Sequence, residues 1–282
     1  MEPERHPLNA AFTWHAASGP FRRITLEQAR AYSEDGYFVL ENASDVDTLR
    51  AVLAEIDPLE AQVEAFLRTR ENGRFFIARA GEITFSPHLV AQSPTLRAFC
   101  ASEVFRDLAH DLIGPDVRLY WDQAVYKKPG TVADFPWHQD NGYTYIEPQQ
   151  YLTCWVALTD VTEANGCPWV VPGLHRRGTL RHWMTELGWR CLEDPKTAVP
   201  APARAGSIVV FSSLTPHRTG PNLTGEIRKA YIVQFAPDGA QTIRIDERTG
   251  ERHEEPCNDP TCQFPVLTAG RPEGLQRWNS GN

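Results

Sequence analysis

The spacing of hydrophobic residues divides the chain into a helical first part and a strand-rich second part. Up to about residue 115, apolar residues recur every three or four positions, which is typical of amphipathic helices. The expected helices lie within residues 25–36, 44–57 and 94–114. Thr25 followed by Gln28 forms a capping-box pattern, so we expect the first helix to begin there.

After Gly114 the pattern changes to short runs rich in β-branched and aromatic residues. These runs occupy residues 118–126, 151–158, 169–171, 207–211 and 229–236. Turn residues separate them and no helical pattern alternates with them, so a doubly wound parallel sheet is not expected. The sequence predicts a mainly β fold with flanking helices, in which an antiparallel jelly roll or sandwich spans about residues 116–237. The helical part, about 1–115, would pack on one outer face.

Residues 172–206 interrupt the strand pattern and are too long for a tight turn. Long inserts of this kind often act as lids or binding loops. We expect a lid that is mobile without ligand and folds over the site with substrate; the alternative is a rigid excursion packed on the sheet. Residues 238–282 read as a polar, proline-rich tail. Without a repeat or a second core pattern, the chain is expected to form a single domain, 1–282.

Composition limits the partners of the chain. Its 282 residues carry a formal net charge of −8, which disfavours contact with a nucleic-acid backbone. No stretch approaches the roughly 20 apolar residues of a membrane helix, and the N-terminus lacks the layout of a secretory signal. We therefore expect a cytoplasmic protein that binds a small-molecule substrate, with no nucleic-acid or membrane partner. The sequence does not determine the oligomeric state.

The six cysteines are scattered through the chain, and without a secretory signal a disulfide framework is not expected. Cys257 and Cys262 follow His253, which raises a zinc site as an alternative. Their spacing matches no compact zinc pattern, and a fourth ligand is missing.

The stretch FPWHQDNGY, residues 135–143, places a histidine and a carboxylate two positions apart. Residues i and i+2 of an extended chain point to the same side, so His138 and Asp140 can address one point. Two histidines and one carboxylate on one face suit iron(II). Alone, this pair equally fits a surface histidine beside a turn aspartate.

Two later residues strengthen the metal interpretation. His217 follows the strand-like run 207–211, and a jelly roll brings such distant strands side by side. His217 can therefore complete a set of two histidines and one carboxylate. Arg228 begins the next strand, and its guanidinium geometry favours bidentate binding of a dicarboxylate.

In this order and spacing the chain resembles the iron(II)- and 2-oxoglutarate-dependent oxygenases, and more closely their phytanoyl-CoA dioxygenase-like branch. The matching blocks are WHQD (137–140), CWVALTD (154–160), NGCPWVVPGLH (165–175), PHRTGPN (216–222) and IRKAY (227–231). The resemblance spans roughly residues 25–236. It implies a double-stranded β-helix, a cupin-like jelly roll, with N-terminal helices.

The resemblance also implies roles for individual residues. The metal ligands, which would form the catalytic centre, fall on His138, Asp140 and His217. The cosubstrate arginine falls on Arg228, and further positions near 2-oxoglutarate fall on Thr219, Trp155 and Gln123.

Candidates for contact with the prime substrate are Trp137, Asn141 and Tyr143 beside the metal motif, and Arg177, Arg181 and Trp183 in the insert. All of them except Tyr143 have a plainer explanation, since buried tryptophans are usually core, Asn141 fits a turn and arginines are often surface charge. His182 lies in a helix-like stretch and is expected at the surface.

The activity that the resemblance implies is a dioxygenase using Fe(II), 2-oxoglutarate and O2. It would hydroxylate, desaturate or cyclise a small organic molecule, such as a natural-product or sugar-containing intermediate, and release succinate and CO2. Because Asp140 is present, halogenation, which relatives without that carboxylate perform, is not expected. Two alternatives stay open: hydroxylation of an acyl-CoA, and a non-catalytic jelly roll that binds a metabolite.

Overall fold

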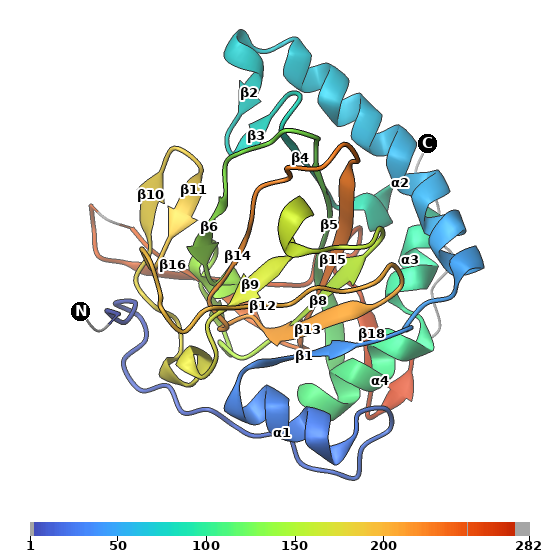
Figure 1. Cartoon of the computed structure of the whole chain (residues 1–282). Helices are drawn as coiled ribbons and strands as arrows, with labels where there is room; N and C mark the ends of the chain where they lie inside the picture. The colour runs from blue at the N-terminus through green and yellow to red at the C-terminus, as the bar shows by residue number, and fades with distance from the viewer. Residues whose placement is uncertain (1–2, 247, 274–282) are drawn as a thin grey trace.

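Two facing antiparallel sheets form the centre of the protein, whose computed structural model describes residues 3–246 and 248–273 (Figure 1). The larger sheet has the order β1-β13-β8-β15-β5-β4-β3-β2, and the smaller sheet has the order β12-β9-β14-β6. The larger sheet comprises β1 (Tyr37–Leu40), β13 (Ile208–Ser212), β8 (Leu152–Ala157), β15 (Arg228–Pro237), β5 (Val117–Lys127), β4 (Ile83–Pro87), β3 (Ala78–Arg79) and β2 (Arg74–Phe75). The smaller comprises β12 (Val199–Pro200), β9 (Pro168–Val170), β14 (His217–Thr219) and β6 (Phe135–His138). The predicted mainly β jelly roll is confirmed.

The larger sheet is covered on both faces, which explains why its strands read as continuous apolar runs. In β15, Tyr231 and Val233 belong to the core beneath the helices, whereas Ala230 and Ile232 point into the core between the two sheets. Successive residues of a strand face opposite sides, so both sets must be apolar. The space between the sheets is the interior that holds the candidate site.

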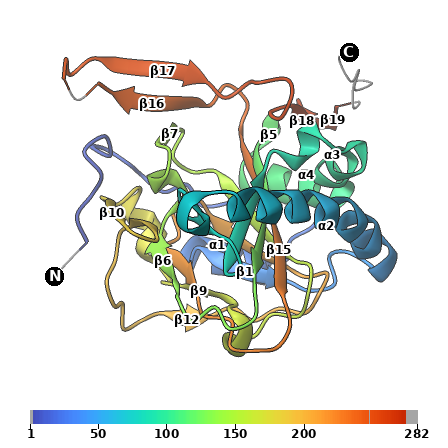
Figure 2. The same cartoon turned by 90° about the horizontal axis from the view of Figure 1, so that it is seen from above.

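Four helices cover the outer face of the larger sheet (Figures 1 and 2). They are α1 (Leu26–Glu34), α2 (Val46–Arg68), α3 (Pro94–Cys100) and α4 (Glu103–Leu112). The capping box of Thr25 and Gln28 is present at α1, as predicted. The structure differs from the prediction in two places: α2 continues past Pro58, and the expected helix 94–114 is divided where Ser102 adopts the extended backbone of an N-cap. Among the described residues, no helix combines the length and the apolar character needed to cross a membrane.

Most of the 172–206 insert is folded against the rest of the protein. It contains the short helix η5 (Leu174–Arg177), the hairpin β10 (Trp183–Thr185) and β11 (Gly188–Arg190), and β12 of the smaller sheet. Leu180, Cys191 and Leu192 are buried in a small core with Trp137. By contrast, Trp183 and Met184 on β10 are exposed. The β10–β11 hairpin is therefore the part of the insert that can serve as a lid, and its mobility stays a prediction.

The C-terminal segment is folded rather than a simple tail. It forms the hairpin β16 (Gln241–Ile245) and β17 (Arg252–Pro256), then β18 (Pro265–Thr268) and β19 (Arg271–Pro272). β16 also pairs with β7 (Ile146–Glu147), and β18 pairs with β5 at the larger sheet. Figure 2 shows the β16–β17 hairpin extending along one side of the molecule. Burial of Phe264, Val266 and Leu267 in the main core ties this segment to the sheet.

The residues of the alternative zinc site are not brought together. Cys257 is buried in a small cluster with Tyr120, whereas Cys262 is buried in the main core, and His253 is exposed on β17. The six cysteines are all buried free thiols.

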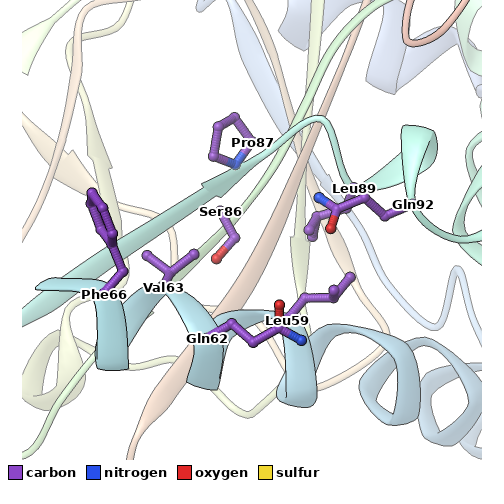
Figure 3. Close-up of a pocket in the computed structure, with 8 residues that line it drawn as sticks. All are labelled: Leu59, Gln62, Val63, Phe66, Ser86, Pro87, Leu89 and Gln92. Atoms are coloured by element: carbon purple, nitrogen blue, oxygen red, sulfur yellow. The ribbon is translucent and has the colours of Figure 1, made fainter.

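A shallow groove of about 270 Å³ lies between α2 and β4 (Figure 3). Its lining is partly apolar, from Leu59, Val63 and Phe66 of α2, and closes against Ser86 and Pro87 of β4. None of these residues was a candidate for the metal or cosubstrate site.

The remaining short 3-10 helices are η1 (Glu71–Gly73), η2 (Leu89–Ala91), η3 (Asp140–Gly142) and η4 (Glu163–Asn165).

Candidate metal and cosubstrate site

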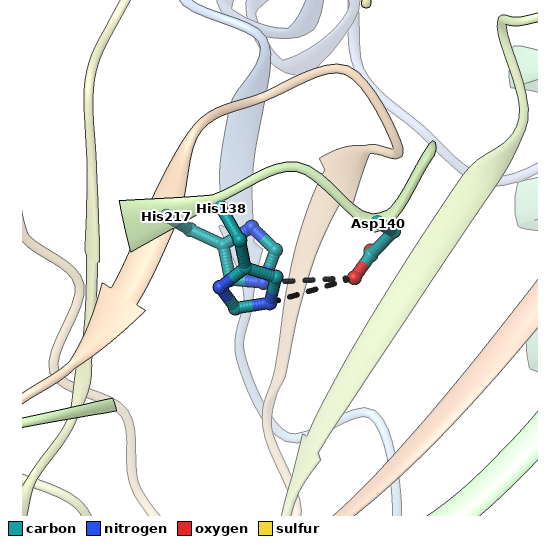
Figure 4. A group of neighbouring side chains, drawn as sticks. All are labelled: His138, Asp140 and His217. Carbon is teal, nitrogen blue, oxygen red and sulfur yellow. Dashed lines mark ion pairs between the residues drawn. The ribbon is translucent and has the colours of Figure 1, made fainter. Parts of the chain in front are cut away.

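The structure brings the three predicted metal ligands together at the edge of the smaller sheet (Figure 4). β6 and β14 are antiparallel neighbours, and their register sets His138 directly opposite His217. Asp140 follows at the start of η3, with its Oδ1 3.9 Å from Nε2 of His138 and 3.7 Å from Nε2 of His217. These distances exceed hydrogen-bond length and suit three donors that share one ion.

The backbone fixes the orientation of both imidazoles. Nδ1–H of His138 donates to the carbonyl of Pro136 at 2.8 Å, and Nδ1–H of His217 donates to the carbonyl of Thr215 at 3.0 Å. Each bond leaves the Nε2 lone pair facing Asp140. Burial, reinforced by the neighbouring His217, lowers the pKa of His138 to about 3, and burial lowers the pKa of His217 to about 4. Both rings are therefore neutral at neutral pH, the form in which histidine binds a metal.

A hydrogen-bond chain from the larger sheet orients Asp140. The hydroxyl of Thr153 on β8 donates to Oδ2 of Asp140 at 2.5 Å, and Nε2 of Gln234 on β15 donates to that hydroxyl oxygen at 3.3 Å. Burial raises the pKa of Asp140, which these donors partly offset. The sequence analysis missed Thr153 and Gln234. Their signal was present, because each is a polar residue inside an otherwise apolar strand.

Arg228 is buried between the sheets with part of its guanidinium unpaired. Its side chain is 1% exposed, and Nη1 donates to the carbonyl of Val125 at 3.2 Å. Nε and Nη2 are buried without a hydrogen-bond partner. Burial lowers the pKa of Arg228 to about 10, so the group stays charged at neutral pH. A buried charged fork with two free donors is costly unless an anion completes it, and a carboxylate matches its geometry.

Of the other predicted cosubstrate residues, Trp155 lies beside this guanidinium. The ring of Trp155 lies 5.4 Å from Cζ of Arg228. Thr219 is buried at the end of β14, two residues after His217. Gln123 lies on β5, two positions before Val125, whose side chain packs in the core between the sheets. Strand alternation therefore directs Gln123 to the same interior.

Lys127 is a further charged residue of this interior that the sequence analysis missed. It pairs with Arg228 across β5 and β15 and is 1% exposed. Its Nζ donates to the carbonyls of Ala133 at 3.1 Å and Gly220 at 2.6 Å. Burial, followed by the charge of Arg228, lowers its pKa to about 7. Lys127 joins the end of β5 to the chain just beyond Thr219, and so holds the backbone beside the predicted cosubstrate site.

Tyr143 is the substrate candidate that lies against a metal ligand. Its ring meets His138 edge-on with centroids 5.2 Å apart. Trp137 lies on the opposite face of β6 from His138, in the small core with the insert. Asn141 is fully buried and bonds to the backbone of Ile146 and to Thr179, which stabilises the turn, and its contact with substrate stays a prediction.

The candidates in the insert lie on η5, on β10 and in the segment between them. Arg181 forms an exposed ion pair with Glu4, and Trp183 is exposed on β10. Arg177 ends η5, where its carbonyl accepts from Asn9 at 2.8 Å. A contact of these three residues with substrate stays a prediction.

His182 was wrongly expected to be a surface residue. Its Nε2 accepts from the backbone N–H of Gln139, the residue between the two ligands, at 3.0 Å. The ring packs so closely on Gly142 that a Cβ there would lie 2.0 Å from it. The side chain of Gln139 also binds the backbone of Gly178 and Leu180. The insert therefore helps to fix the conformation of the metal-binding turn.

Comparison with known proteins identifies the family. The sequence profile described as Phytanoyl-CoA dioxygenase (PhyH) matches residues 32–230, which is most of the chain. The chain belongs to the phytanoyl-CoA dioxygenase family. Phytanoyl-CoA dioxygenase of Arabidopsis thaliana is 25% identical over 246 residues, covering 74% of this chain and 87% of that protein. The resemblance inferred from the motifs is thus confirmed, and with it the enzyme class of a dioxygenase.

Solved structures of oxygenases share the fold. The non-heme alpha ketoglutarate dependent carbocyclase SnoK from nogalamycin biosynthesis superposes with a TM-score of 0.68 at 21% identity, covering 89% of this chain and 100% of its own. EctD from S. alaskensis, crystallised with 2-oxoglutarate and 5-hydroxyectoine, gives 0.65 at 22% identity, covering 91% and 92%.

Proposed function

We propose that this protein is an Fe(II)- and 2-oxoglutarate-dependent oxygenase that oxidises a small organic molecule and releases succinate and CO2. The observation that carries the proposal is a pair of incomplete groups in one interior. The side chains of His138, Asp140 and His217 face one another without forming hydrogen bonds among themselves. The guanidinium of Arg228 has two buried N–H donors, at Nε and Nη2, without a partner. An ion completes the first group, and a carboxylate completes the second.

The donor chemistry of the first group fits iron(II). Two neutral imidazoles and one carboxylate form the facial set of non-heme iron oxygenases and leave positions for other ligands. When bound at His138, Asp140 and His217, iron would supply the oxidising chemistry with O2 and 2-oxoglutarate. The family membership, the alpha ketoglutarate dependence of SnoK and the 2-oxoglutarate bound to EctD support the same choice.

The chain's own residues have separable tasks in this proposal. Arg228 holds the distal carboxylate of 2-oxoglutarate, with Trp155 and Thr219 on the walls beside it. Thr153 and Gln234 keep one carboxylate oxygen of Asp140 turned toward the histidines. Burial of both imidazoles keeps them unprotonated, so that no proton competes with the metal at neutral pH. The three predicted metal ligands converge and Arg228 is buried in the same interior, which supports an enzyme over a passive metabolite-binding jelly roll.

The test is an anaerobic titration of the apoprotein with Fe(II) and 2-oxoglutarate, followed by addition of O2 and measurement of succinate. The wild type should bind one Fe(II) per chain and form succinate. His217→Ala should bind Fe(II) much more weakly and form none, while Asp140→Ala is expected to be the milder loss. His15→Ala, which removes an exposed histidine, is the matched control. Full activity of His217→Ala would refute the metal site.

A further inference from the structure

A cleft of about 890 Å³ lies on the outer face of the smaller sheet. The hairpin tip at Glu186 and Leu187 and the segment around residues 193–198 form its walls, and β6, β9 and β14 form its floor. The floor is built from Trp137, Trp169 and Arg218, whose guanidinium lies 5.4 Å and 5.3 Å from the two indole rings. This volume is in the range of pockets that bind small organic molecules.

Phe135 separates the cleft from the metal ligands. It lines the cleft, and it also packs against the apolar core between the sheets. Its ring meets His138 edge-on with centroids 5.0 Å apart and stacks on Tyr143 at 6.5 Å. A molecule in the cleft is therefore one side chain away from a metal ligand.

The charges of the cleft balance. Its cationic lining residues are Arg79, Arg190, Lys196 and Arg218, and its anionic lining residues are Asp134, Glu186, Glu193 and Asp194. Arg218 pairs with Asp134, and Lys196 pairs with Asp194. A coenzyme A thioester carries several phosphate charges and would require an excess of cations. The balance favours a ligand without net charge.

The polar groups of the lining call for hydroxyl partners. The guanidinium groups of Arg79 and Arg218 bring N–H donors to this lining. Within the described part of the chain, the carboxylates of Glu186 and Glu193 have no recorded ion pair and can accept hydrogen bonds. A hydroxyl group both donates and accepts, so one ligand type satisfies both kinds of group. The half-buried indole of Trp169 offers an apolar face for the ring that carries the hydroxyls.

We propose that this cleft binds the prime substrate. The substrate is a neutral ring compound bearing several hydroxyl groups, such as a glycoside. Phe135 is the specificity-determining residue between the cleft and the metal. This inference rests on the proposed function, because it assigns the substrate class of the same site. Phe135 limits which part of the ligand reaches the metal, whereas Trp169 holds the ring.

Binding is tested on the metal-free protein by equilibrium dialysis, with p-nitrophenyl β-D-glucopyranoside and decanoyl-CoA as probes. The glycoside should bind, and Trp169→Ala should weaken its binding about tenfold or more. Trp121→Phe, which alters a tryptophan outside the cleft lining, should leave it unchanged. Failure of the glycoside to bind, binding of decanoyl-CoA that Trp169→Ala weakens, or glycoside binding indifferent to Trp169→Ala would each overturn the assignment.

The role of Phe135 is tested with Mn(II) in place of iron, by the paramagnetic relaxation of the glycoside protons. Phe135→Ala should keep the dissociation constant within about threefold, yet bring the probe closer to Mn(II) and increase the relaxation. Unchanged relaxation in Phe135→Ala would overturn the role. If the triad binds no Mn(II), the proposed function fails while dialysis still reports on the cleft, so the two failures are distinguishable.

Discussion

Replacing Arg228 with methionine separates the effect of this residue on the free energy of unfolding from its effect on the affinity for 2-oxoglutarate. The side chain is 1% exposed, and its Nε and Nη2 have no partner. Each buried donor left unpaired costs about 1–3 kcal/mol. Methionine occupies similar space without these donors, although it also gives up the hydrogen bond to Val125. We therefore expect the unliganded variant to be at least as stable as the wild type.

The effect on 2-oxoglutarate should have the opposite sign. A charge-assisted bidentate pair is worth about 1.5–3 kcal/mol, or about 10- to 150-fold in the dissociation constant. At a hundredfold excess over the wild-type dissociation constant, the ligand stabilises the wild type by about 2.7 kcal/mol. If binding is weakened a hundredfold, the gain falls to about 0.4 kcal/mol in Arg228→Met.

Urea unfolding with Mn(II) bound, with and without 2-oxoglutarate, measures both effects without turnover. Arg228→Lys should recover part of the ligand effect, because an ammonium keeps the charge but lacks the fork. Equal stabilisation of Arg228→Met and the wild type by 2-oxoglutarate would refute the cosubstrate role. A loss of several kcal/mol in the unliganded variant would refute the argument from unpaired donors.

Three further changes test the surroundings of the site and the core. Thr153→Val should weaken Mn(II) binding about tenfold or more by calorimetric titration, because its hydroxyl orients Asp140; unchanged affinity would show that the orientation has another source. Burial raises the pKa of Asp122 from 3.8 to about 6, so the folded state binds the carboxyl proton more tightly than the unfolded state. The free energy of unfolding should therefore fall by up to about 3 kcal/mol as pH rises from 4 through 6. Asp122→Asn should accordingly gain stability over the wild type at pH 8 relative to pH 4, and a pH-independent difference in urea unfolding would contradict this. Backbone amides of residues 183–190 should exchange faster in the free protein than those of residues 178–182; slow exchange in the hairpin would exclude it as a lid.

Local periodicity predicted the elements that carry their own signal. The strand-like runs at 118–126 and 229–236 became β5 and β15, and the capping box became the start of α1. The run 37–40 was missed because it lies between two helical patterns and pairs with a strand about 170 positions later. The C-terminal strands were missed for a similar reason, since their polar residues alternate with few apolar ones and their partners are distant in sequence.

For the site, motif spacing predicted His138, Asp140 and His217 as metal ligands, and the structure brings these three side chains together, whereas the substrate contacts stay predictions. Trp137 precedes His138, and successive residues of a strand face opposite sides, so strand alternation directs its side chain to the opposite face of β6 from His138, where it lines the cleft. Thr153, Gln234 and Lys127 show a signal that spacing does not contain. They are polar residues in or beside apolar strands, and burying them requires partners that only the folded structure reveals.

The pattern of satisfied and unsatisfied groups separates residues that position the site from residues that await a ligand. Thr153 and Lys127 direct their hydrogens to partners within the chain, and so do the Nδ1 atoms of both histidines. Nε and Nη2 of Arg228 have no such partner, although they lie in the same interior. An unpaired carboxylate oxygen also occurs at Asp122, but there the surroundings are the apolar core beneath the helices, so its effect is on stability alone. A buried N–H group without a partner indicates a binding site when other groups that lack a partner face the same space. In the interior between the two sheets, the unpaired N–H groups of Arg228 and the three predicted metal ligands are such groups.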